Sequence, residues 1–88
     1  MYYLVTYDVR EKNRLQKVFR LLSSYALPLQ ESVFIFVGDA QTFDVMKAEL
    51  CDAVNLKQDD IRLYKLTRHS DVWKWDYRSR REGLFIAL

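Results

Sequence analysis

Apolar positions change their spacing several times along the chain, and each spacing predicts one element. Residues 2–8 are rich in Tyr, Leu, Val and Thr, a composition that favours a β-strand. From Lys12 to about Ser24 the spacing becomes that of an amphipathic helix. Pro28 disfavours helical geometry at the residue before it, so this helix is expected to end ahead of Pro28. The apolar stripe of the helix consists of Leu15, Val18, Phe19 and Leu22.

The second half of the pattern predicts an extended segment, a helix and a strand. Residues 29–37 are expected to be extended, either as one bent strand or as a tight hairpin of two short strands. Asp39 follows a glycine and is a candidate N-cap for a helix from about residue 40 to 55. The pair Asp59-Asp60 is expected to form the turn that opens a strand over residues 61–66. The stripe of the second helix consists of Phe43, Met46, Leu50 and Ala53.

The order of these elements indicates a fold class. If the extended segment is a hairpin, the order is strand, helix, two strands, helix and strand, which is the ferredoxin-like βαββαβ sandwich of the α+β class. Both helices then cover one face of an antiparallel sheet. The chain is long enough for one domain over residues 1–88, with a core over residues 1–67 and a tail over residues 68–88.

The expected strands are apolar on both sides, and this predicts a homodimer. A sheet with one face in water alternates polar with apolar residues, but residues 2–8 and 33–37 do not. In a chain with only two helices, the simplest cover for the second face is another copy. The apolar end of the tail is expected to add a strand to the partner's sheet edge, as an exchanged element. Interface or edge-strand packing, rather than base stacking, is also expected for Trp73, Trp75 and Tyr77.

Composition and charge narrow the compartment and the partners. The net charge is only +2, so a nucleic-acid surface has to come from local clusters of the 14 basic residues. Cys51 is the only cysteine, which excludes an intrachain disulfide and favours a reducing compartment. We see neither the features of a signal peptide nor the about 20 apolar residues of a membrane span. A cytoplasmic protein without a membrane partner is therefore expected.

Asp8 is the first candidate for chemistry. It ends the first expected strand and comes shortly before a basic helical segment. A hard cation such as Mg²⁺ takes oxygen ligands and needs only one or two protein carboxylates when phosphates complete its shell. In a two-fold dimer, two Asp8 side chains can face each other and hold a metal that activates water against a phosphodiester. The alternative is that Asp8 is a turn residue or a helix N-cap.

Basic residues form two clusters, and both suit contacts with nucleic-acid phosphates. The first cluster, on and before the first helix, is Arg10, Arg14, Lys17 and Arg20. The second cluster, in the tail, is Arg78, Arg80 and Arg81. The alternative for both is a solvated surface that keeps the chain soluble. An RNA-recognition consensus does not accompany the clusters, so reading of base sequence is not expected.

Several segments resemble the CRISPR-associated protein 2 family. The first is Tyr7-Asp8-Val9 at the end of the first strand, and the second is Arg14 with Lys17 ahead of the helix stripe. The third is Gln30-Glu31-Ser32-Val33-Phe34, which is similar to the Gln-x-Ser-Val-Phe segment of that family. The later strand from Asp60 to Leu66 also fits. The resemblance spans residues 1–67, and the order and spacing of the segments make it specific.

The resemblance implies a ferredoxin-like homodimer in which Asp8 is the catalytic residue and the metal ligand, with Mg²⁺ or another divalent cation shared between two copies. It gives supporting roles to Tyr7, Ser32 and Phe34, and a nucleic-acid contact to Arg14. It also implies an endonuclease or endoribonuclease activity, and a part in spacer acquisition, in which the dimer binds double-stranded DNA and bridges the CRISPR-associated protein 1 integrase. Two alternatives stay open: a non-catalytic DNA-binding scaffold, and a toxin-type ribonuclease of the VapD-like group.

Overall fold

The computed structural model describes residues 1–66 and 85–87 of the chain. In chain order the elements are β1 (Tyr2–Asp8), α1 (Lys12–Tyr25), β2 (Leu27–Gln30), β3 (Val33–Val37), α2 (Ala40–Ala53), β4 (Asp60–Leu66) and β5 (Phe85–Ala87). Several predictions fall on residues outside the described ranges. They concern Trp73, Trp75, Tyr77, Arg78, Arg80 and Arg81.

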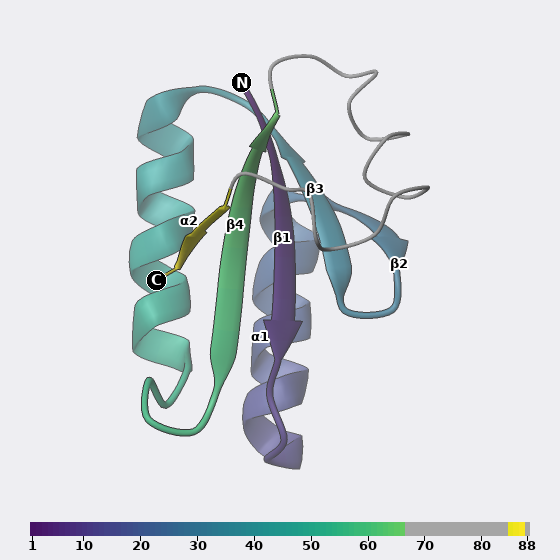
Figure 1. Ribbon diagram of the computed structural model, residues 1–88, viewed down its shortest axis with the longest axis vertical. Helices are drawn as coiled ribbons and strands as arrows, with labels where there is room; N and C mark the ends of the chain where they lie inside the picture. Colours follow the sequence, from purple (N-terminus) through teal and green to yellow (C-terminus); the bar gives the residue numbers. More distant parts are fainter. Residues whose placement is uncertain (67–84, 88) are drawn as a thin grey trace.

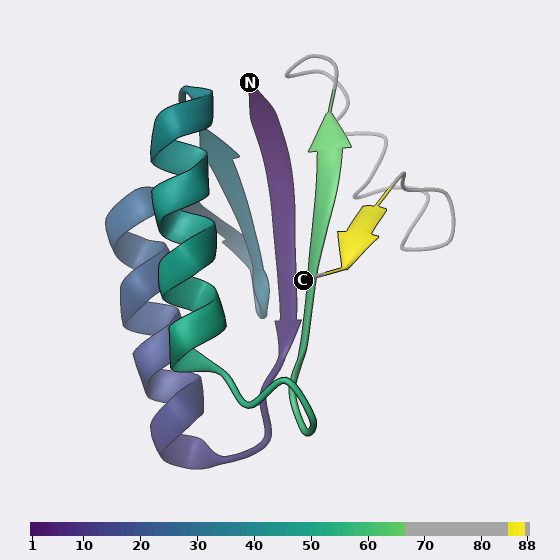
Figure 2. The same ribbon diagram turned by 90° about the vertical axis from the view of Figure 1, so that its left-hand side faces the viewer.

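One antiparallel sheet with the strand order β2-β3-β1-β4-β5 organises the chain. β1 is the central strand, with β3 on one side and β4 on the other. Figure 1 shows the strands side by side, and Figure 2 shows both helices on one face of the sheet. The order of the first six elements and the single helical layer confirm the predicted ferredoxin-like α+β sandwich.

The extended segment is a hairpin, which decides between the two predicted forms. β2 pairs antiparallel with β3, and it begins at Leu27, two residues earlier than expected. The turn between them contains Ser32, whose φ of 62° lies in the left-handed region that tight turns use. Pro28 stands within β2, which is tolerable because β2 is an edge strand and loses little from a missing backbone N–H.

Each helix begins at a carboxylate that caps its free backbone N–H groups. The Glu11 carboxylate accepts hydrogen bonds from the backbone N–H of Asn13 at 2.6 Å and of Arg14 at 3.3 Å. Asp39 accepts from the backbone N–H of Thr42 at 2.8 Å, which confirms its predicted role. Because Glu11 caps α1, the alternative that Asp8 is a helix N-cap is wrong.

The core between the sheet and the helices confirms one predicted stripe and corrects the other. All four predicted residues of α2 are buried there. On α1 only Val18 and Leu22 are fully buried, whereas Leu15 is 37% exposed and Phe19 is 50% exposed. The ring of Phe19 instead lies edge-on to Phe34, with 5.7 Å between the ring centroids. The spacing identified the apolar side of α1 correctly. How α1 packs against the sheet and beside α2 (Figure 2) decides which of these apolar residues are buried.

The opposite face of the sheet carries a second apolar cluster. Its members are at most 3% exposed, and they are Leu4, Val33, Ile35 and Tyr64. Tyr2 and Leu66 pack against this cluster and are only partly buried. Neither α1 nor α2 lies on this side (Figure 2). The predicted two-sided apolarity of the strands is therefore confirmed, while the homodimer that it indicated stays a prediction.

β5 lies at the edge of the sheet beside β4 of the same chain. The two strands pair antiparallel, with Leu63 opposite Ile86. The structure contains one chain, so the predicted exchange of this strand with a partner stays a prediction. Within residues 1–66 and 85–87, neither helix has the length and apolar character needed to cross a membrane.

Candidate functional site

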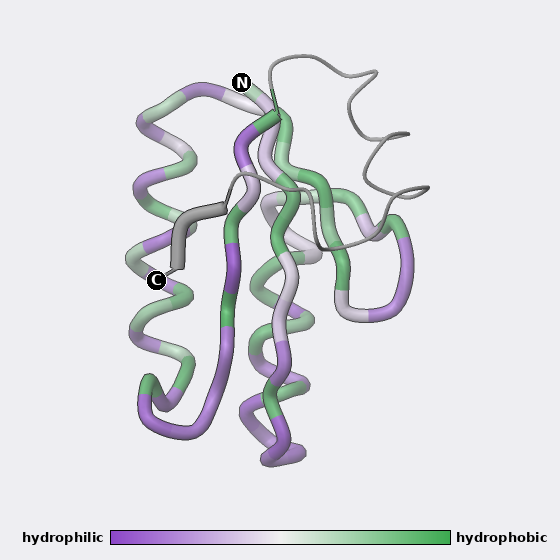
Figure 3. The backbone as a smooth tube through the Cα atoms, in the orientation of Figure 1, coloured by the Kyte–Doolittle hydropathy of each residue, from purple (hydrophilic) through white to green (hydrophobic). Residues whose placement is uncertain are grey.

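Asp8 ends the central strand at the polar end of the sheet. Tyr7, just before it, is buried against the helix side, so the exposed side chain of Asp8 belongs to the opposite face. Figure 3 shows the change from hydrophobic to hydrophilic residues toward this end of β1 and β4. Within the described part of the chain, no hydrogen bond or ion pair engages the Asp8 carboxylate. This carboxylate is therefore accessible and uncommitted there.

A hollow of about 580 Å³ surrounds Asp8 on this face. Three segments that are far apart in the sequence converge on it: the end of β1, the β2–β3 turn and the start of β4. The charged and polar residues that line it include Asp8, Glu31, Ser32, Asp60 and Arg62. Such a concave polar site next to an accessible carboxylate is of a size and kind that suits an ionic ligand.

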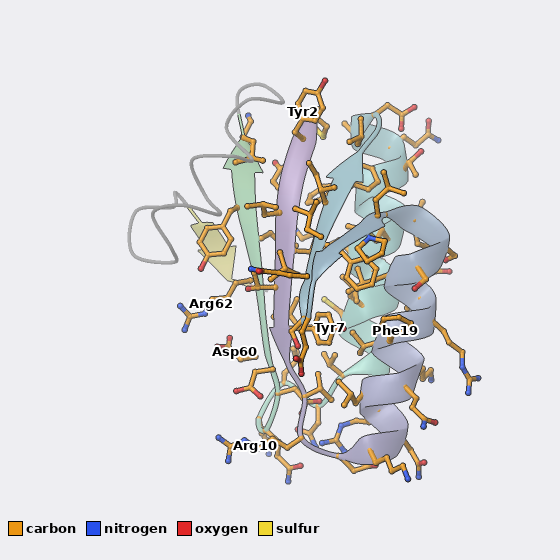
Figure 4. All side chains as sticks on the ribbon, turned by 90° about the vertical axis from the view of Figure 1, so that its right-hand side faces the viewer. Tyr2, Tyr7, Arg10, Phe19, Asp60 and Arg62 are labelled. Atoms are coloured by element: carbon orange, nitrogen blue, oxygen red, sulfur yellow. The ribbon has the colours of Figure 1, made fainter. Side chains whose placement is uncertain are left out.

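The three predicted supporting residues come together behind Asp8, on the helix side of the sheet. The Tyr7 backbone N–H donates to the Ser32 carbonyl at 3.3 Å. The ring of Tyr7 lies 6.2 Å from the ring of Phe34. Burial raises the pKa of Tyr7 from its ordinary value, and a hydrogen bond with the Ser32 side chain acts in the opposite direction. Figure 4 shows Tyr7 pointing toward α1, so these residues fix the end of β1 and thereby the position of Asp8.

Asp60 and Arg62 complete the hollow, although neither was predicted as a site residue. Asp60 is directly opposite Asp8 in the pairing of β1 with β4, and Arg62 is opposite Thr6. Arg62 Nε donates to Asp60 Oδ2 at 3.1 Å. Figure 4 shows both side chains projecting from the sheet on the side away from α1. The sequence indicates that Asp60 and Arg62 lie on the same face of a strand. The register of β1 with β4 then shows that this face is the one that carries Asp8.

Arg14, a predicted phosphate contact, is engaged inside the protein. Its Nε donates to Asp59 Oδ2 at 2.9 Å and its Nη2 donates to Asp59 Oδ1 at 3.2 Å. The Asp59 side chain is fully buried and also accepts from the backbone N–H of Asn55 at 2.9 Å. The hydrogen bond from Arg14 holds the pKa of Asp59 below its ordinary value of 3.8. Arg14 therefore ties α1 to the turn before β4, and its contact with phosphate stays a prediction.

The other basic residues of the first cluster are exposed. No ion pair engages Arg10, Lys17 or Arg20 within the described residues. Lys17 and Arg20 line a shallow groove between the two helices, with Glu49 and Asp52 on its α2 side. Figure 4 shows Arg10 at the same end of the sheet as Asp60. These three cations have no ion-pair partner among the described residues, whereas Arg14 is paired with Asp59.

A single chain does not assemble a complete metal site by itself. Within residues 1–66 and 85–87, no group of three His, Cys, Asp or Glu side chains is placed to hold a metal ion. Asp8 nevertheless offers the hard carboxylate oxygens that Mg²⁺ prefers, and it is exposed. A site at Asp8 therefore needs ligands from outside the chain, which a second copy, water and phosphate can supply.

These features define a small ferredoxin-like domain with an accessible carboxylate at the end of its central strand. The model of the family described as CRISPR associated protein Cas2 matches residues 1–72. The chain belongs to this family, as the resemblance of its segments predicted.

Named relatives agree with this assignment. CRISPR-associated endoribonuclease Cas2 1 of Nitrosomonas europaea is 36% identical over 64 residues, which are 73% of this chain and 61% of that protein. The chain thus spans less than two thirds of that relative. CRISPR-associated endoribonuclease Cas2 2 of Thermodesulfovibrio yellowstonii is 34% identical over 80% of this chain and 77% of its own length. CRISPR-associated endonuclease Cas2 of Halalkalibacterium halodurans is 32% identical over 75% of this chain and 74% of its own length.

A solved structure shows the same architecture. Cas2 of Streptococcus pyogenes, in a crystal structure at pH 6.5, superposes with a TM-score of 0.73 and 32% identity. The superposition covers 94% of this chain and 100% of that one. The hypothetical protein TT1823 of Thermus thermophilus superposes with a TM-score of 0.72 and 30% identity, over 76% of this chain and 82% of that one.

Proposed function

We propose that this chain is a homodimeric nuclease that hydrolyses phosphodiester bonds in nucleic acid through paired Asp8 side chains. The observation that carries the proposal is the state of Asp8, an exposed carboxylate at the end of the central strand that is uncommitted within the described residues. The names of two relatives support it, since one is an endoribonuclease of Nitrosomonas europaea and the other an endonuclease of Halalkalibacterium halodurans.

A dimer through the second face of the sheet supplies what one chain lacks. The second apolar cluster on this face is already buried in the single chain, but at its rim Leu27 is 65% exposed and Val37 is 51% exposed. Burial of such side chains against a second copy is favourable by about 25 cal/mol per Å² of apolar surface. A two-fold axis near the polar end of the sheet relates one Asp8 to the other. Two Asp8 carboxylates are then available where one chain provides one.

The residues at this site fit a divalent cation such as Mg²⁺. Asp8 of each copy would hold the cation, which when bound polarises the phosphodiester and lowers the pKa of its water. Tyr7, Ser32 and Phe34 contribute by positioning, because they hold the end of β1 from behind. The cations that attract the substrate are Arg10, Lys17 and Arg20, which are exposed.

The test compares wild type with Asp8→Asn, and with Asp44→Asn as a matched control on the exposed surface of α2. Labelled single-stranded RNA and duplex DNA are incubated with each protein, with Mg²⁺ and with a chelator in excess. We expect cleavage by wild type and by Asp44→Asn only with Mg²⁺, and background cleavage by Asp8→Asn. Binding of Mn²⁺, followed by its paramagnetic resonance signal, should show one site per two wild-type chains and none for Asp8→Asn. Equal cleavage by wild type and Asp8→Asn contradicts the proposal.

A second candidate function is a scaffold on duplex DNA that bridges the CRISPR-associated protein 1 integrase during spacer acquisition. The exposed cations on α1 favour it, because they lie away from the Asp8 hollow and bind phosphate without any chemistry. If this is the function, a Lys17→Gln/Arg20→Gln double variant should bind duplex DNA more weakly, both alone and in the presence of purified integrase. Asp8→Asn should keep both. Unchanged duplex binding by the double variant contradicts a DNA-binding role for α1.

A further inference from the structure

The ion pair between Arg62 and Asp60 stands beside Asp8 rather than at an arbitrary point of the surface. Both side chains leave β4 on the face that carries Asp8, and strand pairing places Asp60 directly across from Asp8. The pair has a distance of 3.1 Å, and its side chains are 45% and 53% exposed. Arg62 is the one cationic side chain among the described residues that line the hollow.

We propose that Arg62 binds a backbone phosphate of the nucleic acid at the Asp8 site, and that Asp60 is its partner only while the site is empty of substrate. This inference rests on the proposed function, for which it supplies the phosphate contact next to the reacting carboxylate. The guanidinium group offers parallel N–H donors that match two oxygens of one phosphate. Binding of the phosphate replaces the carboxylate of Asp60 at the same guanidinium.

The charge in the hollow favours such a contact. Asp8, Glu31 and Asp60 all line it, so three carboxylates surround the place where a phosphodiester has to lie. Like charges a few ångström apart repel by about 1 kcal/mol even in bulk water and by more near a protein surface. Arg62 is the described residue that can offset this repulsion from within the hollow.

The exchange of one anion for another is easy because the resting pair is exposed. Exposed ion pairs contribute only about 0–1 kcal/mol in general, so little holds Arg62 to Asp60 against a competing anion. A hydrogen bond with Asp60, and after it one with Tyr64, raises the pKa of Arg62, which keeps its charge. Asp60 thus keeps the guanidinium oriented along β4 until a phosphate arrives.

The test measures binding without cleavage, by fluorescence anisotropy of a labelled duplex DNA and a labelled single-stranded RNA on proteins that all carry Asp8→Asn. In this background, we expect Arg62→Gln to weaken binding about tenfold and to reduce the slope of log affinity against log salt by about one. Asp60→Asn removes the competing carboxylate and should strengthen binding about threefold to fivefold. Lys65→Gln is the matched control, because Lys65 is an exposed cation of β4 on the other face, and it should leave binding unchanged.

Two outcomes overturn the inference. One is an affinity for Arg62→Gln equal to that of Lys65→Gln, and the other is a loss of affinity for Asp60→Asn as large as that for Arg62→Gln. Thermal unfolding checks that each variant is folded. Should Arg62→Gln fail to fold, Arg62→Lys replaces it, and it should retain the salt slope with a smaller loss of affinity. Hydrolysis is measured in a separate assay on wild type. An absence of cleavage would therefore contradict the proposed nuclease activity without affecting the result for Arg62, and an unchanged affinity of Arg62→Gln would leave the nuclease proposal intact.

Discussion

Asp59 and Asp60 are neighbours in the sequence, and each pairs with an arginine, but the two pairs lie in opposite environments. The Arg14–Asp59 pair has a carboxylate that is 0% exposed, whereas the carboxylate of the Arg62–Asp60 pair is 53% exposed. The distances are nearly the same, at 2.9 and 3.1 Å. The difference arises where the chain enters β4, because successive residues of an extended chain point to opposite sides. Asp59 turns toward α1, and Asp60 lies on the face with Asp8.

The burial of each ion pair, and not the identity of its residues, decides whether the pair stabilises the fold or is open to ligands. Asp59 accepts two hydrogen bonds from Arg14 and one from the backbone of Asn55, so loss of its charge leaves buried donors without a partner. Among the described residues, the Asp60 side chain accepts a hydrogen bond from Arg62 at the surface, where water can replace either member of the pair. The first pair is therefore expected to stabilise the fold, and the second is expected to respond to ligands.

The largest expected effect is that of Asp59→Asn on stability. The substitution places an amide N–H₂ against the donors of Arg14, so the free energy of unfolding should fall by about 2–4 kcal/mol. Urea denaturation at neutral pH measures it, with Asp52→Asn as the exposed control that keeps its unfolding midpoint. Equal midpoints for the two variants would show that the buried pair adds nothing to stability.

Lowering the pH should reduce the free energy of unfolding by a smaller amount, through protonation of Asp59. The pKa of Asp59 is below 3.8 in the folded chain because of Arg14, so the unfolded chain takes up the proton first as the pH falls. The contribution of Asp59 is thus fully present above about pH 5 and is lost as the pH falls through the lowered pKa. Urea midpoints measured across this range should fall more steeply for wild type than for Asp59→Asn. Parallel curves would mean that Asp59 has no part in acid unfolding.

Arg14→Lys should have a smaller effect still, and it separates stability from nucleic-acid binding. Lysine keeps the charge but loses the paired donation to Asp59 and the contact of Nη2 with Gln58, so the thermal midpoint should drop by less than in Asp59→Asn. Affinity for duplex DNA below the unfolding temperature should stay at the wild-type value, while Lys17→Gln should lower it. A greater loss of affinity in Arg14→Lys than in Lys17→Gln would make Arg14 a phosphate contact after all.

The smallest expected effect is that of Asp60→Asn on stability. The thermal midpoint should not change measurably, and it should not change in about 1 M salt either, where exposed pairs are screened. Differential scanning fluorimetry at low and high salt measures both. A drop comparable to that of Asp59→Asn would remove the distinction between the two pairs.

The sequence predicted the fold well because the fold follows from local spacing. The bounds of β1 and α1 agree with the expectation to within one residue, and the stripe of α2 is correct. Asp8 was identified as an accessible strand-end carboxylate on the same basis. The spacing of apolar residues shows where helices and strands occur and which of their faces are buried. In a small two-layer fold, this information is enough to predict the order of the elements and the two layers.

The partners of the charged residues could not be predicted in this way. Arg14 and Asp59 are 45 residues apart, and nothing in the spacing of α1 indicates which carboxylate its arginine meets. The position of Asp60 and Arg62 beside Asp8 depends on the register between β1 and β4, and a shift of one residue would move them to the other face. The exposure of Phe19 likewise depends on how α1 docks.

The central place of β1 in the sheet has a consequence for how the site behaves when the protein fluctuates. Backbone amides of a strand that is paired on both sides exchange with solvent deuterons only through large openings, whereas an edge strand such as β2 exchanges through local fraying. Mass spectrometry of deuterium uptake should therefore find β1 among the slowest segments of the chain, and β2 among the fastest. Asp8 lies at the end of this slowly exchanging strand. Its position should therefore be kept during local opening of the β2–β3 hairpin.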